Sequence, residues 1–167
     1  MIAELHRMGL TVVMLTEDNG VTARAIAHEL AIDEVRADLT PEEKVAAITQ
    51  LEQAHAGVAM VGDGINDAPA LAQATVGIAM GSAGTDAAIE AADVALMADD
   101  LSKVPFALRL SKKARRISRQ NIAFSLLVLG VLIPSSLVGI LTLVAAVFYH
   151  EASELLAVAN GLRAALR

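Results

Sequence analysis

Short apolar runs alternate with helical patterns along the first 100 residues. The runs at Thr11–Leu15, Val58–Val61 and Val76–Met80 have the length and composition of buried strands. Between them, apolar residues recur at three- and four-residue spacing, as in Val21–Leu30, which is typical of an amphipathic helix. This alternation favours a parallel sheet covered by helices on both faces, so we predict an α/β domain over residues 1–100.

The residues around position 40 mark the start of one helix. Thr40 as N-cap, Pro41 at the first helical position and Glu43 three residues after the cap form a capping box. Lys44 then lies in the first turn, where the helix dipole disfavours a cation. The lysine is therefore either a solvated residue on a helix face or a residue held there for an anion.

The pattern changes after residue 100. Residues 101–120 form a basic amphipathic helix, and no charged side chain occurs between Ile122 and Tyr149. The apolar stretch continues to Leu162, which is too long for one membrane span and suits a hairpin of two, at about 121–138 and 141–162. Cations flank both ends of the segment 121–163, so we expect both ends of the hairpin in the cytoplasm and residues 164–167 as a cytoplasmic tail.

Composition narrows the class of protein. The net charge of −6 is the sum of two unlike parts: an acidic first part, and a segment with seven Lys or Arg between Lys103 and Arg119. Those cations are explained by a neighbouring membrane, so we expect a lipid bilayer and no nucleic acid as partner. The sequence has no cysteine, which excludes disulfides and thiolate ligands, and its start lacks a signal peptide. We therefore predict a multi-pass protein of the cell membrane with its soluble part in the cytoplasm.

Two turns that follow predicted strands carry candidate chemistry. Asp63, Asn66 and Asp67 follow the strand at Val58–Val61, and carboxylates at the carboxyl edge of such a sheet suit Mg²⁺. The alternative is a polar turn with Asp67 near a helix N-cap. The turn from Thr16 to Gly20 could bind phosphate oxygens through hydroxyl and backbone N–H groups, or be an ordinary turn.

Polar residues also interrupt the second predicted membrane helix. They are His150, Glu151, Ser153 and Glu154, with Asn160 further along. Unpaired charges are costly in lipid, and such clusters usually mark an ion pathway. A mutually satisfied polar knot, or an early exit of the helix to the interface, remains the alternative.

Several motifs together resemble a known family. GDGINDAP (Gly62–Pro69) is similar to the hinge motif of P-type ATPases, and MLTEDN (Met14–Asn19) and TPEEK (Thr40–Lys44) precede it in the family's order. The segments VGIAMGSAGTDAAIEAADVAL, RRISRQNI and VANGLR resemble the heavy-metal-transporting branch. The resemblance implies a partial haloacid-dehalogenase-like, Rossmann-like phosphorylation domain followed by a transmembrane hairpin, as the C-terminal part of an ATP-driven metal exporter.

The resemblance also implies roles for individual residues. Asp63 and Asp67 would serve the Mg²⁺ site, Lys44 and Thr16 would contact the phosphoryl group, and Asn66 would support the site. The family usually has glycine where this chain has Glu17. A carboxylate there is electrostatically unfavourable beside a phosphate-binding turn.

In the membrane segment, HEASE (His150–Glu154) resembles the His-Glu-Gly-x-Thr motif of the cobalt-type branch, with Ala152 for glycine and Glu154 for threonine. The resemblance implies that His150, Glu151, Ser153 and Glu154 belong to the site of the transported metal. Imidazole and carboxylate suit Co²⁺, Ni²⁺, Fe²⁺ or Zn²⁺ better than Cu⁺. The family adds ligands from a Ser-Pro-Cys type motif, for which this chain has no cysteine.

The phosphorylated aspartate of the family lies in an Asp-Lys-Thr-Gly-Thr motif, which this sequence does not contain. We therefore expect no nucleophile in this chain, no ATP hydrolysis by the chain alone, and dependence on the remainder of the transporter. Two alternatives stay open at this point. One is a soluble phosphatase of the haloacid-dehalogenase type, and the other is a non-catalytic, truncated membrane fragment.

Overall fold

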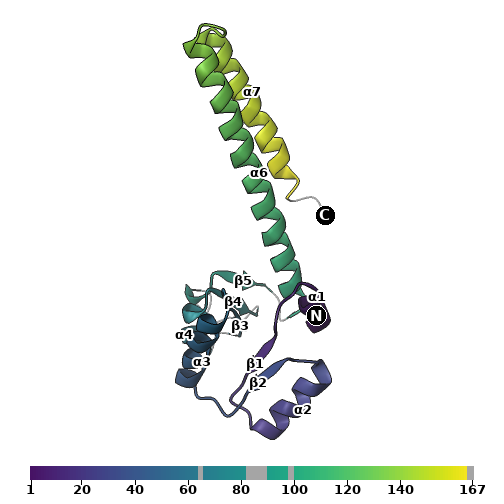
Figure 1. Ribbon diagram of the computed structural model, residues 1–167. Coiled ribbons are helices and arrows are strands. Elements are labelled where there is room, and N and C mark those ends of the chain that lie inside the picture. Colours follow the sequence, from purple (N-terminus) through teal and green to yellow (C-terminus); the bar gives the residue numbers. More distant parts are fainter. Residues whose placement is uncertain (64–65, 82–89, 98–99, 165–167) are drawn as a thin grey trace. The chain divides into compact units, whose positions relative to one another are not determined.

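The computed structural model describes residues 1–63, 66–81, 90–97 and 100–164 (Figure 1). The chain divides into two compact units, Met1–Pro105 and Phe106–Arg167, and each is considered by itself.

Unit 1 contains the predicted alternation of strands and helices. In chain order its elements are α1 (Ile2–Arg7), β1 (Val13–Leu15), α2 (Gly20–Leu30), β2 (Glu34–Arg36), α3 (Pro41–Ala54), β3 (Ala59–Gly62), α4 (Ala68–Gln73), β4 (Val76–Met80) and β5 (Val94–Leu96). The observed strands β1 and β3 begin one or two residues later than the apolar runs that predicted them. The glycine-rich turn after Met80 lies outside the described residues.

All the strand pairs are parallel, as the alternation predicts, but they form two sheets. β1 pairs with β2, with Met14 opposite Val35, while β3, β4 and β5 form a three-stranded sheet in that order. The single continuous sheet suggested by the sequence is therefore not present among the described residues. β1 and β3 each lie at the edge of their own sheet. This difference matters for the site, because both strands end beside it.

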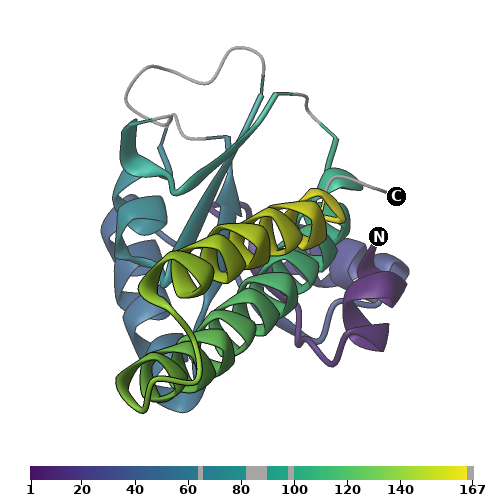
Figure 2. The same cartoon turned by 90° about the horizontal axis from the view of Figure 1, so that it is seen from above.

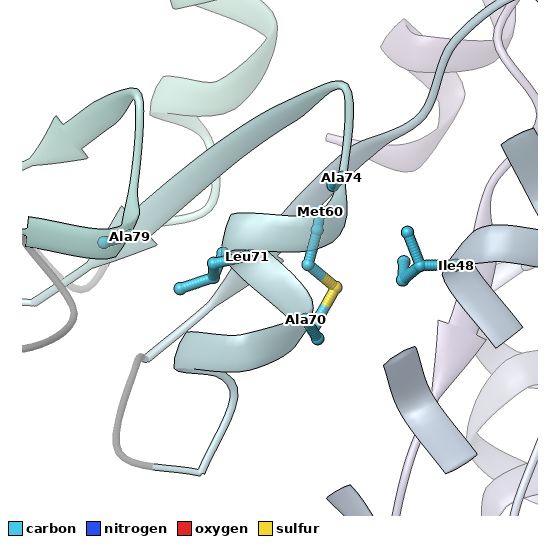
Figure 3. Packing of buried hydrophobic residues seen from close by; sticks show 6 residues of the cluster. All are labelled: Ile48, Met60, Ala70, Leu71, Ala74 and Ala79. Carbon is cyan, nitrogen blue, oxygen red and sulfur yellow. The ribbon is translucent and has the colours of Figure 1, made fainter. Parts of the chain in front are cut away.

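The core of unit 1 lies around α4. One buried cluster is formed by Ile48 of α3, Met60 of β3, Ala70 and Leu71 of α4, Ala74 at the C-cap of α4, and Ala79 of β4 (Figure 3). A Cβ atom on Gly77 of β4 would lie 2.5 Å from the Leu71 carbonyl oxygen, so glycine at this position lets α4 approach the sheet closely. Leu71 itself has 0% of its surface exposed. Complete burial of a leucine stabilises the fold by about 1.5–3 kcal/mol.

The capping box predicted at the start of α3 is confirmed. The Thr40 hydroxyl accepts a hydrogen bond from the Glu43 backbone N–H at 3.3 Å, and the Glu43 carboxylate accepts one from the Thr40 N–H at 2.8 Å. Two N–H groups that the helix leaves unpaired are thus satisfied reciprocally. The cap fixes the first turn of α3, and with it the position of Lys44.

Unit 2 is built from two helices that lie side by side, α6 (Lys103–Leu137) and α7 (Leu143–Leu162), as Figures 1 and 2 show. No helix break separates the basic residues 101–120 from the apolar residues that follow, because α6 is continuous. Within the described parts of the chain, α6 is the one helix long and apolar enough to cross a membrane by length and composition. That α7 also crosses a membrane stays a prediction.

The turn between the two helices lies where the sequence predicts it. Pro134 is inside the last turns of α6, and Gly139 follows with a φ of 77°, a left-handed conformation that favours glycine. The Thr142 hydroxyl then accepts a hydrogen bond from the Ala145 N–H and caps α7. Proline, glycine and a capping threonine together reverse the chain.

Small and polar half-buried residues recur at three- and four-residue spacing along α7. They are Ala146, His150, Ser153, Ala157 and Asn160. Small side chains let membrane helices pack closely, and polar ones join them by hydrogen bonds. Asn160 Nδ2 donates to Asn121 Oδ1 at 2.7 Å, and Asn121 Nδ2 donates to the Ala157 carbonyl at 2.9 Å. These bonds join α7 to α6.

Candidate active site and membrane cluster

Lys44 is the centre of the candidate active site. Lys44 lies in the first turn of α3, and only 7% of its surface is exposed, which is unusual for a lysine. Nζ donates hydrogen bonds to Asp67 Oδ1 at 2.9 Å and to Glu17 Oε1 at 3.0 Å. The alternative of a solvated lysine on a helix face is therefore wrong, since the ammonium group is buried and paired with two carboxylates.

The electrostatic state of Lys44 follows from these contacts. Burial by itself lowers the pKa of the ammonium group, but hydrogen bonds and Coulombic attraction from Asp67 and Glu17 outweigh it, so the pKa of Lys44 is raised. The lysine therefore stays charged throughout the physiological range. A buried permanent cation of this kind is suited to binding an anion.

Asp67 reaches Lys44 because Gly62 makes room for it. A Cβ atom on Gly62 would lie 2.6 Å from Asp67 Oδ2, so a larger residue would displace the carboxylate. Asp67 occupies the N-cap position of α4, yet its side chain makes no capping hydrogen bond. The predicted position of Asp67 near a helix N-cap is thus confirmed, but its carboxylate pairs with Lys44 instead of capping the helix.

Thr16 and Glu17 lie in the turn that follows β1. The Thr16 hydroxyl accepts a hydrogen bond from the Asp18 N–H at 3.1 Å and so shapes the turn. The turn is also fastened to the loop after β2, because the Leu39 N–H donates to the Thr16 carbonyl and the Asp38 N–H donates to the Asp18 carbonyl. These bonds hold Glu17 facing Lys44.

Asp63 and Asn66 are exposed in the turn between β3 and α4, whose residues 64 and 65 lie outside the description. Asp63 follows directly on β3, and Asp67 precedes α4. The structure thus brings Lys44, Asp67 and Glu17 into contact, with Thr16 next in sequence to Glu17. Their direct contact was not predicted, although an acidic residue in a turn after a strand was a usable signal.

The predicted membrane cluster is arranged more loosely. His150 Nδ1 lies 3.7 Å from Glu154 Oε1 within the same helix, and the Ser153 hydroxyl donates to the His150 carbonyl at 2.7 Å. Among the described residues no group of three or more His, Asp or Glu could hold a metal ion. The polar knot between helices is made instead by Asn121 and Asn160, and sequence reasoning had not singled out Asn121.

His150 and Glu151 border a groove of about 450 Å³ between α6 and α7. The other lining residues are mostly apolar: Leu129, Leu132, Ile133, Ser136, Leu137, Leu143, Ala146 and Val147. His150 and Glu151 therefore line a mostly apolar hollow of the hairpin.

Comparison with known proteins agrees with the motifs. The family model of the haloacid dehalogenase-like hydrolases matches residues 1–75. A probable cadmium-transporting ATPase of Listeria monocytogenes is 51% identical over 163 residues, which cover 97% of this chain and 23% of that protein. Probable cation-transporting ATPase G of Mycobacterium tuberculosis is also 51% identical, over 98% of this chain and 21% of its own length.

A solved structure matches both units. The crystal structure of a zinc-transporting PIB-type ATPase in the E2.Pi state has a TM-score of 0.90 and 43% identity, covering 99% of this chain and 27% of that one. The chain thus spans about a quarter of the length of these relatives. It belongs to the heavy-metal-transporting P-type ATPases and corresponds to a C-terminal part of them.

Proposed function

We propose that this chain supplies the phosphoryl-binding part of the phosphorylation domain, and the last membrane hairpin, of an ATP-driven exporter of divalent metal ions. The observation that carries the proposal is the buried, doubly paired ammonium group of Lys44 at the carboxyl ends of parallel strands. Phosphoryl transfer is catalysed mainly by positioning and by neutralising charge, and a fixed cation does both. In the complete transporter Lys44 would bind the phosphoryl oxygens.

Asp63 and Asp67 fit the Mg²⁺ ion that such chemistry requires. Asp63 directly follows β3 and Asp67 directly precedes α4, and hard oxygen donors of this kind are what Mg²⁺ prefers. Lys44 contacts Asp67 through Oδ1, and the other oxygen, Oδ2, lies on the side of Gly62. A bound Mg²⁺ would neutralise phosphate charge, while Thr16 and Asn66 would orient the group.

The nucleophile would come from another segment of the transporter. β1 and β3 belong to different sheets, yet the residues that follow them meet at Lys44 through Glu17 and Asp67. A further parallel strand placed between these two edges would bring its own carboxyl end to the same lysine. An aspartate at that end could then be phosphorylated by ATP beside Lys44.

We propose a divalent metal ion such as Co²⁺, Ni²⁺, Fe²⁺, Zn²⁺ or Cd²⁺ as the transported substrate. Imidazole and carboxylate ligands favour this class over Cu⁺. His150 and Glu151 would contribute from the groove, with Ser153 and Glu154 beside them. Further ligands would come from other helices of the transporter, and the lipid bilayer would cover the rest of the hairpin.

The test is metal-stimulated ATP hydrolysis by the complete transporter in detergent, measured for each of these ions and for Cu⁺. We expect one or more divalent ions to stimulate hydrolysis, and Lys44→Met to reduce it at least about 100-fold, as for other lost transition-state charge partners. Lys103→Met, at an exposed lysine, is the matched control and should keep full activity. Full activity of Lys44→Met would contradict the proposal.

The same assay separates the metal site from the phosphoryl site. His150→Ala and Glu151→Ala should each abolish stimulation by metal, while phosphorylation by inorganic phosphate remains, because the phosphoryl site is intact. Leu155→Ala, at an exposed apolar residue of α7, serves as control. Unchanged metal stimulation in both variants would show that neither His150 nor Glu151 binds the transported metal.

A further inference from the structure

Lys44 has two carboxylate partners, and they differ in how firmly they are held. Asp67 is 17% exposed and packs against Gly62, so it has little room to move. Glu17 is 46% exposed and reaches the same ammonium group from the turn after β1. Of the two contacts, the one to Glu17 is therefore the one that an incoming anion can replace.

We propose that Glu17 is a built-in competitor for the phosphate-binding position at Lys44. Its carboxylate occupies a hydrogen-bonding position on Nζ when no phosphoryl group is bound, and it must swing out into solvent before an inorganic phosphate or phosphoryl oxygen can take that position. The proposal rests on the proposed function, because it assumes that Lys44 is the residue that binds the phosphoryl group.

The backbone around Glu17 confines this motion to its side chain. The turn is fixed by hydrogen bonds from the Asp38 N–H to the Asp18 carbonyl at 2.9 Å and from the Gly20 N–H to Asp38 Oδ2 at 3.1 Å. With the turn held, rotation of the Glu17 side chain is the simplest way to clear Nζ. Because Glu17 is exposed, its released carboxylate is hydrated, so the rotation costs little free energy.

Charge makes simultaneous occupation unfavourable. Phosphate carries between one and two negative charges near neutral pH, and Glu17 adds another within hydrogen-bonding distance of the same ammonium group. Two anions at one cation repel each other in a partly buried site, where screening by water is reduced. Glu17 should therefore lower the affinity for phosphate, while Lys44 remains the residue that binds it.

The experiment is a titration of the full 167-residue chain in detergent with inorganic phosphate, followed by NMR of the Lys44 side-chain ammonium and ε-methylene signals. The variants are Glu17→Gln, which keeps the shape but removes the charge, and Glu42→Gln, a matched exposed glutamate in the first turn of α3. Lys44→Met lacks these signals, so the backbone amide signals of Thr16 and Glu17 are followed in all variants as well. In Lys44→Met they report whether phosphate still binds at this turn or only elsewhere on the chain.

We expect Glu17→Gln to bind phosphate about 3- to 10-fold more tightly than the unmodified chain, the range expected for loss of one partly exposed charge contact. Glu42→Gln should change the affinity much less, and Lys44→Met should abolish binding at this site.

Equal affinity of Glu17→Gln and the unmodified chain would overturn the competitor role and leave Lys44 as the phosphate ligand. Equal tightening by Glu42→Gln would overturn it too, because general charge would then explain the effect. No phosphate at Lys44 in any variant, Glu17→Gln included, would overturn both the competitor role and the assignment of Lys44 under the proposed function.

Discussion

Both units contain ionisable residues close to apolar ones, but these residues find their partners in different ways. In unit 1, Lys44 Nζ is paired at 2.9 and 3.0 Å with carboxylates from two other parts of the fold. In unit 2, the one ion-pair partner of His150 among the described residues is Glu154 of its own helix, at 3.7 Å. The first arrangement is held together by tertiary structure, whereas the second depends on one helix alone.

The apolar side chains show the same contrast. Unit 1 encloses its core, in which Leu71 is fully buried, whereas α7 has no buried residue and Val144 is 81% exposed. Large exposed apolar surfaces on a helix pair are expected where lipid or other helices cover them. The contacts of Lys44 with Glu17 and Asp67 are therefore held within unit 1, whereas the metal site that we propose at the membrane cluster would need ligands from other helices.

The largest expected effect sharpens the contrast in packing. Leu71→Ala should destabilise unit 1 by about 2–5 kcal/mol, because it leaves a cavity in the enclosed core. The measurement is amide hydrogen exchange of β3 and β4 in the chain purified in detergent. Val144→Ala is the comparison and should leave this exchange unchanged. Similar exchange in Leu71→Ala and the unmodified chain would show that α4 does not support the sheet.

A smaller effect is expected at the polar contact between α6 and α7. Asn160→Ala removes the hydrogen bond to Asn121 Oδ1 and the one accepted from Arg163 Nη1. Only the first of these bonds joins α7 to α6, because Arg163 caps the C-terminal end of α7 itself. A hydrogen bond between membrane helices contributes about 0.6 kcal/mol on average, so we expect hairpin stability to fall by about this amount.

The hairpin can be followed by energy transfer between labels on cysteines introduced at Leu126 and Leu156, since the sequence has no cysteine of its own. The midpoint of its dissociation in increasing SDS should fall for Asn160→Ala. Val158→Ala, at an exposed position of α7, should leave the midpoint where it is. An unchanged midpoint in Asn160→Ala would mean that apolar packing alone joins the helices.

The smallest effect is a pH dependence in unit 1. The Val12 N–H donates to Asp33 Oδ2 at 2.8 Å and His6 Nε2 lies 2.9 Å from the same oxygen, so the pKa of Asp33 is lowered from its ordinary value of 3.8. A lowered folded-state pKa stabilises the fold above the unfolded-state pKa, and this stability is lost as the pH falls through the folded-state pKa.

Asp33→Asn should therefore lower the urea midpoint of unit 1 slightly at pH 6, and the difference from the unmodified chain should shrink below about pH 4. Glu29→Gln, at an exposed glutamate of α2, provides the control for surface charge. A difference that stayed constant from pH 6 to pH 3 would assign the effect to something other than ionisation of Asp33.

Local signals in the sequence determined most elements of this protein. Apolar runs predicted β1, β3 and β4, while Thr40, Pro41 and Glu43 predicted the start of α3. The length of the apolar stretch predicted a reversal of the chain between two helices. Each of these features depends on residues close together in the chain, so spacing and residue type were sufficient. The GDGINDAP motif likewise indicated the family before any contact was known.

Tertiary structure decided what those residues touch. Glu17, Lys44 and Asp67 lie in three separate segments, and only the fold shows that their side chains meet at one ammonium group. The division into two sheets and the bond between Asn121 and Asn160 are also contacts between distant segments. No local pattern in the sequence encodes such contacts. They depend on how the helices and strands pack and on which side chains are thereby placed beside a buried charge.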